Sequence, residues 1–264
     1  MPFQIKSSKK TESLAQKKEY QSKNDKIQDV LKAEEIKKKA GGKEILKGVS
    51  IECRRGEIIG LLGPNGAGKT TTLLTIAGFQ KPDSGKILLE GEDITYLPVH
   101  KRAEKGIVFL PQETSLFDDI DVYGNFKIAC ELAKIDTRKI YESAEKFGIT
   151  ELLKKKVRVL SGGEKRKSEI ARLFMLSPKF LILDEPFAGI DPKSIQMIMK
   201  ILEKISKEEK VGVIISDHNV RDVMKICNKI YLIYDGKILE EGSPEKILSS
   251  LKAKDVFFGE DFSL

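Results

Sequence analysis

The chain has 264 residues, of which 40% are hydrophobic, and its formal net charge at pH 7 is +7. This length and composition can build one large α/β domain or two small ones, and they exclude an intrinsically disordered chain. The longest apolar stretches, at residues 58–62 and 180–183, fall far short of the roughly 18 residues that a membrane-spanning helix needs. We therefore expect any role at a membrane to depend on a partner.

The excess positive charge lies near the N-terminus. Residues 1–47 contain 13 lysines and 7 acidic residues, whereas the rest of the chain has 34 basic and 33 acidic residues. A nearly neutral body does not favour nucleic acid as a partner. Residues 1–29 are rich in Lys, Ser and Gln, which predicts a flexible extension. The start of the chain shows no secretory signal and its three scattered cysteines suit a reducing compartment, so a cytoplasmic protein is expected.

From about Val30 onward, short apolar runs alternate with helical patterns, which is typical of strands and helices around a parallel sheet. A hairpin is expected where two apolar runs flank Asp235-Gly236. The strands, in chain order, are expected at residues 45–53, 57–62, 86–89, 107–110, 180–184, 211–216, 229–234 and 237–241.

Helices are expected at residues 69–78, 193–207, within 160–177 after an initial turn, and from residue 243 onward. The last of these starts at Ser243-Pro244, with serine as its cap and proline in its first position. Ser161, with Glu164 three residues later, predicts a capping box at the start of the helix within residues 160–177.

Residues 63–70 read Gly-Pro-Asn-Gly-Ala-Gly-Lys-Thr, which fits the phosphate-loop pattern between a strand and a helix. The glycines let successive backbone N–H groups point at a phosphate, and the dipole of the new helix adds positive charge. Lys69 can reach the β and γ phosphates, and the Thr70 hydroxyl can bind Mg²⁺. The residues predicted to bind the nucleotide here are Gly63, Pro64, Asn65, Gly66, Ala67, Gly68, Lys69, Thr70 and Thr71.

A second nucleotide-site pattern follows the apolar run at residues 180–183. Asp184 comes at the end of this strand, which would hold its carboxylate rigidly and let it orient Mg²⁺ or its water. Glu185 is then placed to act as general base on the attacking water. Two acids that merely end a strand are a weaker explanation, because the phosphate loop is also present.

Four further motifs carry a family resemblance. Residues 160–164, Leu-Ser-Gly-Gly-Glu, resemble the signature motif of ABC ATPases, and Gln112 matches the glutamine of their Q-loop. Residues 189–191 are similar to the D-loop, and His218 matches the histidine of the H-loop. The six motifs extend over residues 63–218 in the order found in ABC ATPases, which makes the resemblance highly specific.

The resemblance implies an α/β fold with a P-loop NTPase core, that is, a RecA-like, mainly parallel sheet with flanking helices. An antiparallel β subdomain and a small α-helical subdomain at about residues 113–177 complete the implied nucleotide-binding domain, which would span residues 30–264. Such domains pair head to tail, so that the phosphate loop of one subunit and the signature of the other enclose each ATP. A homodimer is implied, and the residues that bind ATP across its interface are Ser161, Gly162, Gly163 and Glu164.

The resemblance also implies roles around the γ phosphate, with ATP and Mg²⁺ as cofactors. A lone histidine is usually structural, but His218 directly follows a predicted strand, where this family uses it to contact the γ phosphate and hold the attacking water. The implied catalytic residues are Lys69, Gln112, Glu185 and His218. The implied Mg²⁺ ligands are Thr70, Gln112 and Asp184.

Two departures from the family pattern matter. The aromatic residue that stacks on adenine should fall near Ala40, where no aromatic residue is nearby, so the group that holds the adenine stays open. Glu164 replaces the usual glutamine of the signature, which preserves backbone contacts to phosphate but adds a negative charge close by.

Only one phosphate loop is present, so a full ATPase requires a second copy or a related chain. The 48 residues between Gln112 and Ser161 leave room for a small helical subdomain but not for the long coiled coil of chromosome-maintenance relatives. The subunit of a transporter fits best, peripheral on the inner membrane through two transmembrane permease subunits. A soluble ABC ATPase without membrane partners is the less favoured alternative.

Several local strings resemble the ATPases of lipopolysaccharide export systems, among them residues 97–100, 110–113 and 184–189 and the terminal Gly-Glu-Asp-Phe at 259–262. The ATPases of branched-chain amino acid importers share many of these strings and stay open as an alternative. In either case a groove near the Q-loop is expected to receive a coupling helix of the membrane partner.

Phe117 is the candidate residue of that groove, with an ordinary core phenylalanine as the alternative. Asp118 and Asp119 stand where basic residues are often found in this family, so the contacts with the partner are expected to differ.

Overall fold

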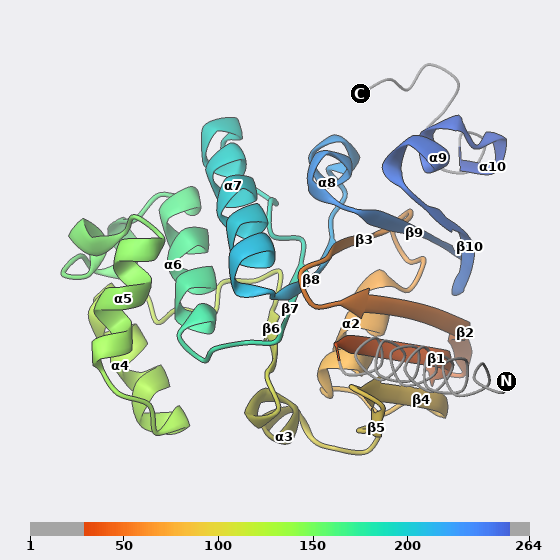
Figure 1. Cartoon of the computed structure of the whole chain (residues 1–264), viewed down its shortest axis with the longest axis horizontal. Coiled ribbons are helices and arrows are strands. Elements are labelled where there is room, and N and C mark those ends of the chain that lie inside the picture. The colour runs from red at the N-terminus through yellow and green to blue at the C-terminus, as the bar shows by residue number, and fades with distance from the viewer. Residues whose placement is uncertain (1–28, 254–264) are drawn as a thin grey trace, which may run out of the picture.

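The computed structural model describes residues 29–253, and its strands form two sheets (Figure 1). The smaller sheet has the strand order β2-β1-β4-β5, and all its strand pairs are antiparallel. The strands of the smaller sheet are β1 (Val30–Ala40), β2 (Lys43–Arg54), β4 (Ser84–Leu89) and β5 (Glu92–Asp93).

Residues 1–28 of the predicted extension and the terminal string at residues 259–262 lie outside the described residues.

The larger sheet has the strand order β10-β9-β3-β8-β7-β6. All its neighbouring strands are parallel except β10, which pairs with β9 in the antiparallel sense. A mainly parallel sheet beside an antiparallel one, with helices around them, confirms the predicted fold class. The strands are β3 (Ile58–Leu62), β6 (Ile107–Leu110), β7 (Phe180–Asp184), β8 (Gly212–Ser216), β9 (Lys229–Tyr234) and β10 (Lys237–Gly242).

One helix, α2 (Lys69–Ala77), packs between the two sheets. Its buried Leu73 and Ile76 share a hydrophobic cluster with Leu46 of β2 and Ile182 of β7. The other helices are α3 (Val99–Glu104), α4 (Val122–Ala133), α5 (Arg138–Lys146), α6 (Gly162–Phe174), α7 (Pro192–Glu209), α8 (Val220–Ile226), α9 (Pro244–Ser249) and α10 (Leu251–Ala253). Two short 3₁₀ segments, η1 (Thr150–Leu152) and η2 (Val157–Val159), lie between α5 and α6.

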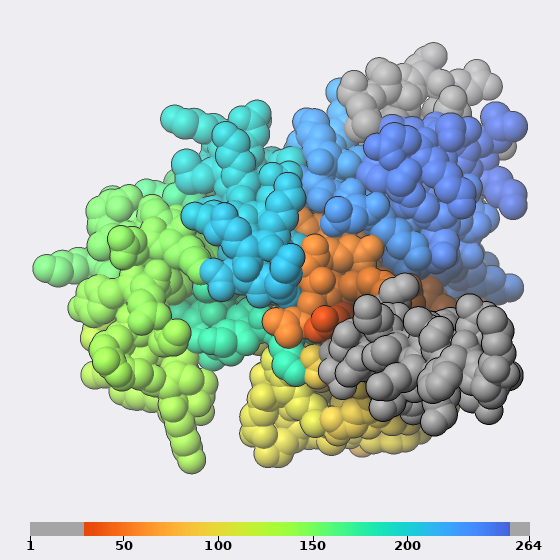
Figure 2. Space-filling view, viewed as in Figure 1, coloured from red at the N-terminus to blue at the C-terminus, as the bar shows by residue number. Residues whose placement is uncertain are grey.

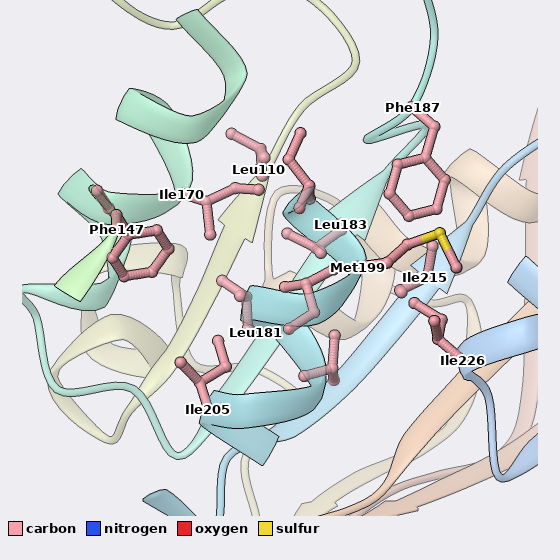
Figure 3. Close-up of a cluster of buried hydrophobic side chains, with 14 of the residues drawn as sticks. Leu110, Phe147, Ile170, Leu181, Leu183, Phe187, Met199, Ile205, Ile215 and Ile226 are labelled. Atoms are coloured by element: carbon pink, nitrogen blue, oxygen red, sulfur yellow. The ribbon is translucent and has the colours of Figure 1, made fainter. Parts of the chain in front are cut away.

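A second hydrophobic cluster covers the opposite face of the larger sheet. Leu181 and Leu183 of β7 pack there with Met199 and Ile205 of α7 and with Ile215 of β8 (Figure 3). Phe180 and Ile182 of β7 belong instead to the cluster around α2, because successive side chains of a strand point to opposite faces. Helices α4, α5 and α6 lie together on one side of the molecule (green in Figure 1).

Local turn and cap chemistry follows the predicted pattern. Asp235 and Gly236 join β9 to β10 with φ values of 44° and 73°, as in the two-residue turns that favour Asp-Gly. Ser243 caps α9, since its hydroxyl accepts a hydrogen bond from the N–H of Lys246, and Pro244 is the first residue of that helix. The prediction that this helix is the last one is wrong, because the short α10 follows it. No helix in residues 29–253 has the length and apolar character that crossing a bilayer requires.

Candidate functional site

The predicted phosphate loop connects β3 to α2. Gly66 and Gly68 have φ values of 79° and 107°, a region that residues with side chains rarely adopt. A Cβ atom at Gly63 would lie 2.1 Å from the carbonyl oxygen of Ile233, so only glycine fits between the loop and β9. The start of α2 has no side-chain cap, which leaves this helix N-terminus suited to an anion.

Lys69 is the first residue of α2 and is 7% exposed. Its Nζ donates hydrogen bonds to the carbonyl oxygens of Gly63, at 2.7 Å, and Pro64, at 3.0 Å. Burial lowers the pKa of Lys69, and the negative charges of Glu185 and Asp184 oppose that shift. The ammonium group therefore lies inside the loop and close to the two acids of the second nucleotide motif.

Asp184 ends β7, is 2% exposed, and pairs across the sheet with Ser216 at the end of β8. The Ser216 hydroxyl donates a 2.5 Å hydrogen bond to Asp184 Oδ1, which fixes the carboxylate. Thr70, in the phosphate loop, is exposed. A carboxylate and a hydroxyl are hard oxygen donors of the kind that Mg²⁺ takes together with phosphate oxygens and water. These residues therefore fit the predicted metal.

Three predicted catalytic residues meet at the carboxylate of Glu185. Gln112 Nε2 donates a 2.9 Å hydrogen bond to Glu185 Oε2, and His218 Nδ1 lies 3.3 Å from the same oxygen. Glu185 has a φ of 47°, and its N–H donates to the carbonyl of Ser216 at 2.7 Å. The three residues follow β6, β7 and β8, whose carboxyl ends lie at one edge of the parallel sheet.

The signature residues form a separate group at the start of α6. Ser161 Oγ accepts from the N–H of Glu164, and Glu164 Oε2 accepts from the N–H of Ser161 at 2.9 Å, which confirms the capping box. The hydrogen bond from the Ser161 N–H is the main cause that lowers the pKa of Glu164. A Cβ atom at Gly163 would lie 2.2 Å from Ser194 Oγ, so glycine lets α6 start against α7.

The phosphate loop and the signature lie on different faces of the larger sheet. Helix α2 belongs to the cluster between the two sheets, and α6 belongs to the cluster on the opposite face. Within residues 29–253, no hydrogen bond or ion pair joins residues 161–164 to residues 63–71. One copy of the chain therefore holds two separate groups of predicted ATP-binding residues.

Phe117 lies between β6 and α4, and its side chain is 59% exposed. The alternative of a core phenylalanine is therefore wrong. The buried Asn125 of α4 holds the Phe117 backbone, because Asn125 Oδ1 accepts from its N–H at 2.8 Å and Asn125 Nδ2 donates to its carbonyl at 3.1 Å. Figure 2 shows a notch in the surface between α4 and α5 (green) and the region of β5 and α3 (yellow).

Asp118 and Asp119 both form ion pairs within the chain. Asp118 Oδ1 lies 3.0 Å from Lys165 Nζ of α6, and Asp119 Oδ1 lies 3.5 Å from Arg158 Nη1. These two contacts tie the segment after Gln112 to residues on either side of the signature. The side chains of Asp118 and Asp119 are 54% and 90% exposed, so both acids are accessible to a partner.

Ala40 is exposed at the end of β1, where it pairs with Lys43 of β2 across a two-glycine turn. The next residues of β2 border the phosphate loop, since a Cβ atom at Gly68 would lie 2.7 Å from the Leu46 side chain. The side chain of Ala40 is a single methyl group and provides no aromatic ring for stacking on a base.

Sequence reasoning missed Asp217, which is fully buried beside His218. Its carboxylate accepts from the N–H of Phe187 at 2.9 Å and from the N–H of Asn219 at 2.8 Å. Burial raises the pKa of Asp217. The carboxylate thus ties the segment after β7 to the segment after β8. No pattern in the sequence marks an acid next to a histidine as buried.

Arg166 was also missed, although its side chain donates to the carbonyl of Glu185 at 2.9 Å. It is buried on α6 together with Gly163 and Ile170, three residues before it and four after it. That helical spacing is the signal that could have located it. Lysines on both sides made the segment resemble a solvated basic surface.

Comparison with known proteins gives matches over most of the chain. The family model described as ABC transporter matches residues 46–188. The lipopolysaccharide export system ATP-binding protein LptB of Haemophilus influenzae is 42% identical over 240 residues, which cover 89% of this chain and 99% of that protein. The protein of the same name from Escherichia coli K12 is 41% identical over 239 residues, with the same two coverages. A solved nucleotide-free ATP-binding cassette from an ABC transporter has a TM-score of 0.81 and 27% identity, covering 88% of this chain and 100% of the cassette.

Proposed function

The chain belongs to the ABC transporter family as an ATP-hydrolysing subunit, and from this premise we propose that it powers the export of lipopolysaccharide. The observation that supports the catalytic assignment is the meeting of Gln112 and His218 at the carboxylate of Glu185, close to Lys69. The cargo is inferred from the relatives named for lipopolysaccharide export, whose identity to this chain extends over nearly their whole length. That identity favours export over import of branched-chain amino acids.

ATP binds with its phosphates against residues 63–71. Lys69 gives up its hydrogen bonds to the carbonyls of Gly63 and Pro64 and contacts the β and γ phosphates. Binding is favoured because hydrogen bonds to a charged phosphate are stronger than those to a neutral carbonyl. The N-terminus of α2 adds its dipole. Thr70 and Asp184, with the side-chain oxygen of Gln112, would hold Mg²⁺, which would supply positive charge to neutralise the phosphates.

Glu185 accepts a proton from the attacking water. Gln112 and His218 both contact Oε2 of Glu185, so Oε1 is the oxygen that we assign to the water. The side chain of His218 is 61% exposed, which allows it to contact the γ phosphate and the water at the surface of the site. Gln112 and His218 thus orient the base and the water.

A second copy of the chain completes each site. The start of α6 carries N–H groups and the positive end of a helix dipole, and in one copy it lies on the other face of the sheet from α2. A triphosphate on one copy is therefore closed by residues 161–164 of the other. The carboxylate of Glu164 is held in the capping box, where it accepts a hydrogen bond from the Ser161 N–H.

The membrane partners are two transmembrane permease subunits, and the chain is peripheral on the cytoplasmic side of the inner membrane. The exposed Phe117 is the proposed contact for their coupling helices. Closure of two copies around ATP would move this surface and thereby the permeases. Such coupling uses binding energy that only the closed state provides.

Purification of the chain from native membranes tests this proposal. We expect two transmembrane subunits to copurify, and the reconstituted complex to release lipopolysaccharide from the bilayer only with ATP. Amino acid importer permeases in their place would overturn the cargo but leave the ATPase assignment intact. Purification without any transmembrane protein would overturn the transporter role.

A further inference from the structure

Arg166 lies behind the proposed catalytic base. The residue is 5% exposed, and its guanidinium group uses all five of its N–H donors. The bond lengths lie between 2.9 and 3.2 Å. The acceptors are the backbone carbonyls of Pro111, Asp184, Glu185 and Pro186 and one carboxylate oxygen of Glu169.

Glu169 extends this arrangement to the segment that carries Gln112. It lies three residues after Arg166 on α6, is 2% exposed, and bonds Arg166 through Oε2. Its other oxygen accepts hydrogen bonds from the Thr114 hydroxyl and from the N–H and hydroxyl of Ser115. The Arg166–Glu169 pair therefore contacts the chain before and after Gln112.

The backbone at Glu185 needs such support. Its φ of 47° is disfavoured for a residue with a side chain and persists only where the surroundings hold it. Ser216 holds the Glu185 N–H from β8, and Arg166 holds the Glu185 carbonyl from α6. The position of the base thus depends on α6.

We propose that Arg166, held by Glu169, is a positioning residue for ATP hydrolysis. It fixes the segments of Glu185 and Gln112 relative to the helix whose first turn closes on the ATP of a partner copy. Arg166 acts through Glu185 and does not contact the phosphates. This inference rests on the proposed function. A lysine would keep the charge but offer three donors on a point charge instead of a planar group with five.

The test compares Arg166→Lys with Arg102→Lys in the full chain. Arg102 is a matched control because it is 1% exposed and donates four hydrogen bonds to backbone carbonyls, those of Thr75, Ile76, Thr95 and Leu97. We expect Arg166→Lys to lower kcat about 100-fold, the size of effect that a misplaced catalytic group produces. KM should change by less than about threefold. Arg102→Lys should lower the melting temperature and leave kcat near the wild-type value.

A double variant separates positioning from general stability. Added to Glu185→Gln, Arg166→Lys should lower the residual rate by less than about twofold, because Arg166 acts through the group already removed. The inference would be overturned if the loss of hydrolysis rate in the double variant equalled the product of the losses in the two single variants. It would also be overturned if Arg166→Lys and Arg102→Lys lowered kcat equally. If Arg166→Lys does not fold, Glu169→Gln provides the same test, since it keeps the side-chain shape and removes the charge that holds Arg166.

The wild type and Glu185→Gln test the proposed function separately. An inactive wild type, or a fully active Glu185→Gln, would contradict the proposed function itself. An inactive Glu185→Gln beside a normal Arg166→Lys would contradict only the role of Arg166.

Discussion

The side-chain amide of Gln112 donates a 2.9 Å hydrogen bond to the carboxylate of Glu185, although 73 positions separate the two residues. The contact follows from the sheet, because β6 and β7 are parallel neighbours in which Leu110 pairs with Leu183. The segments that leave both strands must therefore start side by side. This places an amide donor on the acid that we propose as the base.

Glu185→Gln should remove hydrolysis and keep ATP binding. The substitution retains the side-chain shape but not the proton acceptor, and kcat is expected to fall by about 10²- to 10⁴-fold. Phosphate release and equilibrium nucleotide binding measure the two effects. Glu208→Gln, at an exposed glutamate near the end of α7, is the control and should behave as wild type. Normal turnover by Glu185→Gln would remove Glu185 from the role of base.

Lys69→Ala should weaken ATP binding. The ammonium group is buried and already bonded to two loop carbonyls, so it is held where the phosphates would lie. Loss of a charged hydrogen bond corresponds to roughly a 10- to 100-fold weaker Kd. Titration calorimetry with ATP measures the change. The exposed Lys81 provides a control, and equal affinity of Lys69→Ala and Lys81→Ala for ATP would contradict the phosphate-loop assignment.

The buried strands of the larger sheet could be predicted within one or two residues, because β3, β7 and β8 are buried at every position and read as unbroken apolar runs. The strand β1 was missed. It is rich in lysine and glutamate, and register shifts against β2 at Ala33, Ile36 and Lys38 interrupt its alternation. Its pairing depends on β2 and β4, which a local pattern does not contain.

The chemistry-bearing residues of the site were predictable because each follows a recognisable strand or turn. The packing behind them was not. Arg166 is hidden between two lysines, and its acceptors come from segments up to 55 positions away. The exposure of Phe117 depends on Asn125, eight residues further on, which holds its backbone. Such contacts arise only once the helices have packed against the sheet.

Phe117→Ala should disrupt association with the membrane partners and leave the isolated chain unchanged. Because the side chain is 59% exposed, its removal should change the free energy of unfolding by less than about 0.5 kcal/mol. Copurification from membranes and ATP hydrolysis by the isolated chain are the two measurements. Tyr141→Ala removes an aromatic side chain of α5 that is 56% exposed and serves as the control. Undiminished copurification of Phe117→Ala would exclude this residue from the contact.

The mass of the Glu185→Gln protein in solution with saturating ATP and Mg²⁺ tests the central claim most directly. That claim is that each ATP is enclosed by the phosphate loop of one copy and residues 161–164 of another. Light scattering should give twice the 29.6 kDa of one chain with ATP and Mg²⁺, and the mass of a monomer without nucleotide. A monomer at saturating ATP, under conditions where the wild type hydrolyses it, would contradict the shared site.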